Sequence, residues 1–336
     1  MVALYVASLE KGGGKTTISS GLGRHLLSAG KRIGFFKPVI SANTKPPKEH
    51  TDSDAVFIKH LFALEESPDL LCPVFSDEGN LRQGIKEAYA KVSQDKDVVI
   101  VEGVSDQSQA SRSIVETLDA RVIIVAGYSK ELPKAIDSYR NLGRHLLGVV
   151  LNKVPASRLA RARGEISTQL AQAGVNILGV LPENRFLLTL TIGELTEHIQ
   201  GEILSGAEKA AELVENLMLG AMGVDPGPAY YNRKTNKAAV VRGERADMQL
   251  AVLETSTRCL ILTGKTAPNP IVLYRAKEKK VPIILTRDDI PTVVTNIESA
   301  LGSTRFNQDN KLAKLTEIME QHFDFPALYK GLGLDS

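Results

Sequence analysis

Short apolar runs alternate with longer stretches of helical periodicity, and this alternation limits the possible folds more than any other feature of the chain. The predicted strands span residues 2–7, 33–36, 98–101, 122–126, 147–151 and 177–181. The predicted helices between them span residues 16–28, 54–63, 132–142 and 158–173. Continuous apolar runs of this kind are typical of parallel strands that helices cover on both faces. The sequence therefore predicts an α/β fold with a doubly wound, mostly parallel sheet and a ligand crevice at the C-terminal ends of its strands.

A second, smaller α/β region follows. Residues 192–219 are predicted to be mostly helical, and residues 220–228 are rich in glycine and proline, which indicates a boundary. Strands are then predicted at 238–241, 259–263 and 283–285, and helices at 245–254, 271–278 and 292–301. A last amphipathic helix, at 309–322, is expected to dock on the protein itself. We therefore expect domains at 1–218 and 219–302 and a C-terminal helical tail at 303–336.

The composition argues against several classes of function. The 41 Lys and Arg residues balance 39 Asp and Glu residues, with a formal net charge of +2, so the chain lacks the basic character of a nucleic-acid binder or a polybasic membrane anchor. The two cysteines, Cys72 and Cys259, have no metal-ligand spacing. No stretch approaches the roughly 20 apolar residues that a membrane span requires. We expect a cytoplasmic protein with no nucleic-acid or membrane partner.

A glycine-rich segment at residues 8–17, Ser-Leu-Glu-Lys-Gly-Gly-Gly-Lys-Thr-Thr, lies between the first predicted strand and the first predicted helix. Glycines let backbone N–H groups turn toward a phosphate chain, and the helix N-terminus adds a favourable dipole. In such a phosphate-binding loop (P-loop), Lys15 would reach the β- and γ-phosphates and the Thr16 hydroxyl would ligate Mg²⁺. Leu9 replaces a glycine of the usual pattern, so the alternative is a glycine-rich turn that only begins a helix. The predicted nucleotide-binding residues here are Glu10, Lys11, Gly12, Gly13, Gly14, Lys15, Thr16 and Thr17.

Charged side chains follow two other predicted strands. Glu102 comes directly after the apolar run 98–101, in the layout of a Walker B element, and would hold Mg²⁺. Lys37 follows the run 33–36 and would neutralise charge on the phosphates, and Asp52 or Asp54 would add a metal ligand. The alternatives are an ordinary carboxylate at a strand end, a solvated lysine before a proline, and an Asp-Ser-Asp helix cap.

Asn152 and Lys153 end another predicted strand and resemble the start of the Asn-Lys-x-Asp segment with which GTPases select guanine. Pro155 stands where that segment has its aspartate. Without this carboxylate a contact to the guanine ring is missing, whereas the Asn152 amide could pair with the N6 and N7 edge of adenine. ATP or ADP, together with Mg²⁺, is therefore favoured over GTP.

As a set, these segments resemble a known family. Residues 8–16, 37–41, 52–54, 101–103, 152–153 and 178–183 follow the order and approximate spacing of dethiobiotin synthetase-like P-loop proteins. The resemblance covers residues 1–218 and implies a P-loop NTPase-type fold, ATP and Mg²⁺ as ligands, and a homodimer. It implies catalytic roles for Lys15 and Lys37, a metal site of Thr16, Asp54 and Glu102, and nucleotide-binding roles for Ser41, Asn152, Pro182 and Glu183.

The second half of the chain resembles another family. Residues 240–247 and 262–265 are similar to the DRTGG domain, with Glu244 in place of its usual aspartate and Lys265 in place of a glycine. The two domains in this order are similar to the N-terminal portion of long-form bacterial phosphate acetyltransferases. This resemblance implies a regulatory module without the acyltransferase domain, and a protein partner or a second small ligand at the DRTGG-like domain. The alternative for residues 243–247 is a turn that begins a helix.

These observations lead to one main hypothesis and two alternatives. Residues 104–106, Val-Ser-Asp, are bulkier and more negative than the glycine-rich turn of dethiobiotin synthetases, which argues against productive binding of their substrate. We therefore expect an ATP- and Mg²⁺-binding regulatory protein that senses nucleotide, hydrolyses ATP slowly or not at all, and does not transfer acetyl groups. The alternatives are an ATP-dependent C–N ligase of the dethiobiotin synthetase or cobyrinate diamide synthase type, and a non-catalytic interaction scaffold.

Overall fold

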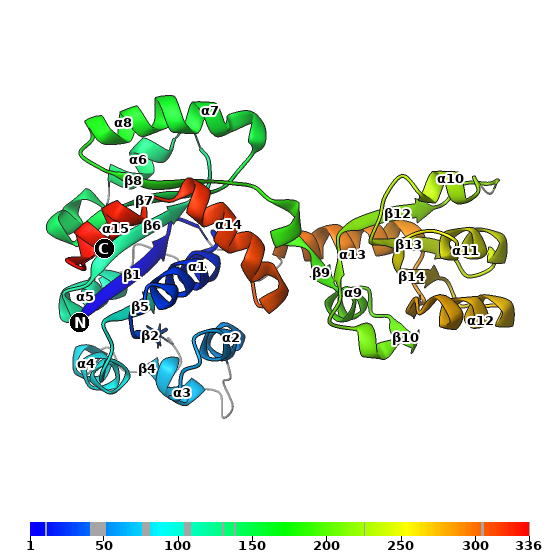
Figure 1. Ribbon diagram of the computed structural model, residues 1–336, viewed down its shortest axis with the longest axis horizontal. Coiled ribbons are helices and arrows are strands. Elements are labelled where there is room, and N and C mark those ends of the chain that lie inside the picture. Colours follow the sequence, from blue (N-terminus) through cyan, green and yellow to red (C-terminus); the bar gives the residue numbers. More distant parts are fainter. Residues whose placement is uncertain are drawn as a thin grey trace. The chain divides into compact units, whose positions relative to one another are not determined.

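The computed structural model describes residues 1–10, 12–40, 52–75, 81–103, 109–129, 131–137, 139–224, 226–303 and 306–335. Its contacts divide the chain into two compact units (Figure 1). Unit 1 comprises Met1–Leu187 and Phe306–Ser336, and unit 2 comprises Leu188–Arg305, so unit 2 is an insertion in unit 1. This division falls before the boundary expected after residue 218. It also joins residues 306–336 to unit 1 instead of leaving them as a separate tail.

The sheet of unit 1 confirms the predicted doubly wound fold. The described residues form a six-stranded sheet in the order β2-β5-β1-β6-β7-β8, in which every neighbouring pair is parallel. The strands are β1 (Val2–Ser8), β2 (Ile33–Phe36), β5 (Val98–Glu102), β6 (Arg121–Ala126), β7 (Leu146–Val154) and β8 (Ile177–Pro182). Because all of them run the same way, their C-terminal ends meet at one edge of the sheet.

Helices connect the strands of unit 1 (Figure 1). The helix expected at 132–142 ends at residue 137 and is followed by a 3-10 helix, Arg140–His145, in which Gly143 has a positive φ of 51°. A π-helical turn, Ala162–Ile166, continues α7 into α8. Two short strands, β3 (Val39–Ile40) and β4 (Val74–Phe75), pair apart from the main sheet. The helices are α1 (Lys15–Ser28), α2 (Ser53–Leu61), α3 (Pro68–Leu71), α4 (Leu81–Val92), α5 (Gln109–Leu118), α6 (Leu132–Asp137), α7 (Leu159–Arg161) and α8 (Ser167–Gln172).

The C-terminal segment packs on the core of unit 1. α14 (Leu312–His322) lies against α1 and β8, and α15 (Phe325–Leu332) also contacts β8. Gly21 of α1 makes room for α14, because a Cβ at this position would clash with the buried side chain of Met319. Gly179 of β8 forms a β-bridge with Phe323. The amphipathic helix expected at 309–322 therefore docks on its own protein, as predicted.

Unit 2 is a smaller α/β unit, as predicted. Its sheet has the order β10-β15-β14-β13-β12, in which β10 is antiparallel to β15 and the other pairs are parallel. None of the helices in the described ranges of either unit is long and apolar enough to cross a membrane. The elements are α9 (Ile192–His198), β10 (Glu202–Ser205), β12 (Asn216–Gly220), α10 (Pro228–Tyr231), β13 (Lys237–Arg242), α11 (Ala246–Leu253), β14 (Thr257–Thr263), α12 (Pro270–Lys279), β15 (Ile283–Thr286) and α13 (Ile290–Ser303).

The prediction that residues 192–219 are mostly helical is wrong. The α-helix in this segment, α9, begins with a capping box in which Thr191 and Glu194 exchange side chain to backbone hydrogen bonds. The chain then forms β10, β11 (Leu213–Val214) and β12, and β11 pairs with β9 (Leu190–Thr191). The apolar residues fit a helical spacing, but pairing with strands distant in the sequence makes them strand residues.

Replacing Gly21 with alanine tests how the C-terminal segment is seated. The added methyl group would clash with Met319, so we expect the free energy of unfolding to fall by about 1 to 3 kcal/mol, the usual cost of overpacking. Gly164→Ala is the matched control, because a Cβ at this helical glycine meets nothing within 4 Å. It should stabilise the protein by about 0.5 to 1 kcal/mol. Urea unfolding measures both, and equal effects would contradict the packing of α14 on α1.

Candidate functional site

The segment between β1 and α1 has the strand, loop and helix context that a P-loop requires. The backbone is left-handed at Gly12 (φ 76°) and at Gly14 (φ 95°), a conformation that favours glycine. The Glu10 carbonyl accepts a hydrogen bond from Ser8 Oγ at 2.8 Å, which closes the start of the loop. Lys15 begins α1, and its ammonium group donates to Ser8 Oγ at 3.2 Å. The lysine side chain therefore folds back toward the end of β1.

The end of β7 holds this loop in place. Asn152 Nδ2 donates to Gly13 O at 3.0 Å, and a Cβ at Gly14 would clash with the same amide. Lys153, which has a positive φ of 55°, donates through Nζ to Gly12 O at 3.2 Å. Sequence reasoning assigned Asn152 to the adenine base and gave Lys153 no role. In the structure both residues position the P-loop, and the pairing of Asn152 with adenine stays a prediction.

The residue that follows β6 also supports the loop, through a hydrogen bond to Glu10. Glu10 Oε1 accepts a hydrogen bond from Gly127 N at 3.0 Å, a contact that the sequence alone did not reveal. Glu10 therefore shapes the P-loop by binding the protein's own backbone, and its contact with a nucleotide stays a prediction. Thr17, another predicted nucleotide-binding residue, lies in the first turn of α1.

The other predicted nucleotide-binding residues lie elsewhere. Pro182 ends β8, and the next residue, Glu183, donates through its backbone N–H to Val154 O at 2.8 Å. This contact places both residues beside the end of β7, the strand that supports the P-loop. Lys11 and Ser41 lie outside the described residues.

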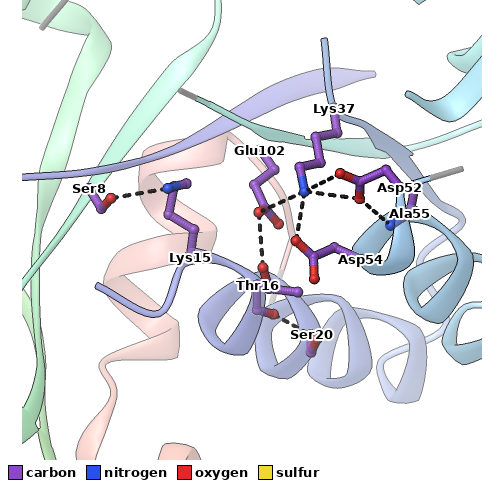
Figure 2. A network of polar contacts seen from close by, with 9 residues as sticks. All are labelled: Ser8, Lys15, Thr16, Ser20, Lys37, Asp52, Asp54, Ala55 and Glu102. Carbon is purple, nitrogen blue, oxygen red and sulfur yellow. Dashed lines mark hydrogen bonds and ion pairs between the residues drawn. The ribbon is translucent and has the colours of Figure 1, made fainter. Parts of the chain in front are cut away.

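Charged side chains gather beside the P-loop where β2 and β5 end (Figure 2). These strands pair in parallel with Phe36 beside Val101, so the next residues, Lys37 and Glu102, are also neighbours. Thr16 Oγ1 donates to Glu102 Oε1 at 2.9 Å. Lys37 Nζ lies 3.9 Å from the same oxygen. The structure thus brings together the P-loop threonine, the predicted Walker B carboxylate and the predicted second lysine.

The start of α2 adds two carboxylates to this cluster. Asp52 is the N-cap of α2, and its Oδ1 accepts a hydrogen bond from Ala55 N at 2.9 Å. Lys37 Nζ donates to both oxygens of Asp52 at 3.0 Å and to Asp54 Oδ2 at 2.7 Å. The sequence analysis placed Asp54 in the metal site and left two possible roles for Asp52, a helix cap or a metal ligand. In the structure Asp52 caps the helix and also binds Lys37.

Burial and opposite charge set the protonation of the cluster. Glu102 is 3% exposed, and burial raises its pKa to about 7, with Lys37 opposing this shift and Asp54 adding to it. Burial works to lower the pKa of Lys37, but the three surrounding carboxylates outweigh this effect and raise it. Burial lowers the pKa of Lys15, and Glu102 offsets only part of that change. Lys37 is therefore the principal cation within the carboxylate cluster.

The oxygen atoms of Thr16, Asp54 and Glu102 suit a hard divalent cation such as Mg²⁺. Glu102 Oε2 is buried and has no hydrogen-bond partner among the described residues, so it is available as a ligand. Within the described ranges, no group of three or more His, Cys, Asp or Glu residues is arranged to hold a metal. Mg²⁺ in proteins commonly combines one or two carboxylates with water and phosphate oxygens. The donor set therefore fits a metal that arrives together with a phosphate chain.

In unit 2, residues 243–245 form the turn between β13 and α11, and residues 246–247 begin that helix. Gly243 N donates to Thr263 O at 2.9 Å. Arg245 forms an ion pair with Asp247, at 2.6 Å between Nη2 and Oδ2, and donates to Met222 O at 3.1 Å. The segment thus fits the structural alternative, a turn that begins a helix. Ligand binding at this turn stays a prediction.

The family comparisons agree with the two units. The model of the AAA domain family matches residues 2–189, and the model of the DRTGG domain family matches residues 194–300. The chain therefore belongs to this AAA domain family, with a P-loop in unit 1, and it carries a DRTGG domain in unit 2. This is the order of domains that the sequence predicted.

Two curated relatives and one solved structure illustrate the similarity. A phosphate acetyltransferase of Nitrosomonas europaea is 24% identical over 367 residues, which cover 99% of this chain and 52% of the relative. The chain thus spans about half the length of that relative. An ATP-dependent dethiobiotin synthetase of Clostridium perfringens is 24% identical over 226 residues, which cover 59% of this chain and 98% of the relative. The MinC:MinD cell division protein complex of Aquifex aeolicus is 17% identical with a TM-score of 0.41, covering 56% of this chain and 84% of that chain.

Glu102 should make the stability of the ligand-free protein depend on pH. Folding raises its pKa from 4.5 to about 7, so between these pH values the folded state holds a proton that the unfolded chain has released. The contribution of Glu102 to stability is therefore full below the lower pKa and is lost as pH rises through the upper one. As the pH rises from 5 to 8, the free energy of unfolding of Glu102→Gln should therefore increase by about 2 to 3 kcal/mol relative to that of the wild type. Urea unfolding at both pH values measures this, and a pH-independent difference would contradict it.

Proposed function

We propose that this protein binds an adenine nucleotide with Mg²⁺ at the P-loop of unit 1 and acts as a nucleotide-sensing regulatory module. The hydrogen bond from Thr16 to the buried Glu102 carries this proposal, because it joins the P-loop to the end of β5 and leaves Glu102 Oε2 available for a metal. If the glycine-rich segment were only a turn that begins α1, the fold would not require a buried carboxylate bonded to the Thr16 hydroxyl group. P-loop amides at a helix N-terminus suit a phosphate chain.

Each residue of the site has a defined task in this proposal. The P-loop N–H groups and Lys15 bind the phosphates, and Thr16, Asp54 and Glu102 hold Mg²⁺. The metal supplies positive charge against the phosphate oxygens when it is bound. Any hydrolysis is an in-line transfer of the terminal phosphoryl group of ATP to water, in which the bond to the bridging oxygen breaks and ADP leaves. We propose slow turnover, because Lys37 is already neutralised by neighbouring aspartates and offers little charge to the transition state.

The insertion of unit 2 supports a regulatory role. The chain leaves unit 1 shortly after β8 and returns to it just before α14. α14 packs on both β8 and α1, and α1 begins with the P-loop lysine. A shift of α1 on nucleotide binding would therefore reach the elements that flank both connections of unit 2. We propose that unit 2 passes the nucleotide-bound state to a protein partner or binds a second small ligand. We also propose that the protein is a cytoplasmic homodimer and that neither unit transfers acetyl groups.

An ATP-dependent C–N ligase is the second candidate. The observation in its favour is the position of Lys37. Its ammonium group lies beside the predicted metal ligands, where an acceptor oxyanion would need a cation. ADP release with and without small carboxylates, diamines and amide donors separates the candidates. If the protein is a regulatory module, ADP release should be slow and these compounds should leave its rate unchanged. A stimulation of about tenfold or more, about 1.4 kcal/mol in activation free energy, would support the ligase. The absence of any thermal shift with millimolar Mg-ATP would instead support a scaffold.

Lys15→Ala tests the nucleotide site directly. The substitution removes a charged hydrogen bond to phosphate, worth about 1.5 to 3 kcal/mol, so ATP affinity should fall by about tenfold or more. Lys91→Ala, at an exposed lysine in the last turn of α4, is the control and should leave the affinity unchanged. Isothermal titration calorimetry with Mg-ATP measures both. Equal affinities of the wild type and Lys15→Ala would contradict the assignment of the P-loop.

A further inference from the structure

Lys37 already contacts two of the predicted metal ligands (Figure 2). Its ammonium nitrogen lies 2.7 Å from Asp54 Oδ2 and 3.9 Å from Glu102 Oε1. A lysine ammonium and a divalent cation are attracted to the same carboxylate oxygens and therefore compete for them. In the structure Lys37 is the counter-cation of these two carboxylates. A metal can use both of them fully only if Lys37 has another acceptor.

Asp52 provides that acceptor. Both of its carboxylate oxygens lie 3.0 Å from Lys37 Nζ. An ammonium group has three N–H donors, so two contacts to Asp52 can persist when the contact to Asp54 is lost. The helix cap fixes Asp52, because its Oδ1 also accepts the Ala55 N–H at 2.9 Å. The cap hydrogen bond thus holds Asp52 beside the lysine.

The surroundings make the position of Lys37 energetically important. The side chains of Lys37, Asp52 and Asp54 are 15 to 17% exposed, and that of Glu102 is 3% exposed. Water screens charges weakly at such positions, so an ion pair here counts for more than one on the surface. Removing one partner leaves the other charge uncompensated in a partly buried place. The choice of acceptor for Lys37 should therefore affect metal binding measurably.

We propose that Asp52 is a positioning residue that keeps Lys37 when Asp54 and Glu102 bind a divalent cation, and that it thereby sets the Mg²⁺ concentration that the nucleotide site requires. The inference rests on the proposed nucleotide-binding function of unit 1. It gives Asp52 a role beyond capping α2, without making it a metal ligand. Asp52 acts through Lys37 and touches neither the metal nor the nucleotide.

Asp52→Asn tests this inference. Asparagine caps a helix about as well as aspartate, so α2 is retained while the charge that holds Lys37 is removed. ATP affinity is measured by calorimetry over a series of Mg²⁺ concentrations, and the Mg²⁺ midpoint is compared with that of the wild type. We expect the midpoint to rise about tenfold, equivalent to about 1.4 kcal/mol, with little change in the ATP affinity measured without Mg²⁺. Asp52→Ser, which also preserves a cap, replaces Asp52→Asn if circular dichroism shows that the latter is unfolded.

The same substitution in a Lys37→Met background separates positioning from general electrostatics. If Asp52 acts through Lys37, Asp52→Asn should leave the Mg²⁺ midpoint of Lys37→Met unchanged, because the competing cation is gone. If Asp52 only adds negative charge to the site, the midpoint should rise equally in both backgrounds. An equal rise, or no rise in either background, would overturn the inference and leave the nucleotide site standing. A wild-type protein that binds no ATP at any Mg²⁺ concentration would overturn the proposed function, and this inference with it.

Discussion

The parallel register of β2, β5 and β1 is the constraint on which the candidate site depends. These strands are neighbours in the sheet, and their ends lead into Lys37, Glu102 and the P-loop. Three segments that are distant in the sequence are thereby brought to one edge of the sheet. Side chains alternate between the two faces of a strand, so a slip of one residue in β5 would turn Glu102 away from Thr16. The sheet therefore determines the site before any ligand arrives.

This placement has an electrostatic cost. A carboxylate as buried as Glu102 is unfavourable in its charged form, and one of its oxygens has no hydrogen-bond partner among the described residues. Lys37 offsets part of this cost, and Asp52 and Asp54 hold that lysine in turn. The same unsatisfied groups that lower stability are those that a metal and a phosphate chain could satisfy. Stability and the proposed ligand binding are therefore linked at one cluster.

The inserted position of unit 2 adds a second level of organisation. The C-terminal segment returns to unit 1 and packs where Gly21 and Gly179 make room for it. These glycines lie on α1 and β8, the helix after the P-loop and the strand before the insertion. Both covalent connections of unit 2 thus lead into elements of unit 1 that pack on one another, and the proposed regulatory role would use this path.

Local patterns predicted the strands of unit 1, the loop between β1 and α1, and the carboxylate that ends β5, because burial, glycine content and strand ends leave marks in short stretches of sequence. The strands within 192–219, the support of the P-loop by Asn152 and Lys153, and the contact of Asp52 with Lys37 were not predictable in this way. Nor was the insertion of unit 2. Each depends on hydrogen bonds or packing between segments far apart in the chain, and only the folded structure decides which of these segments meet.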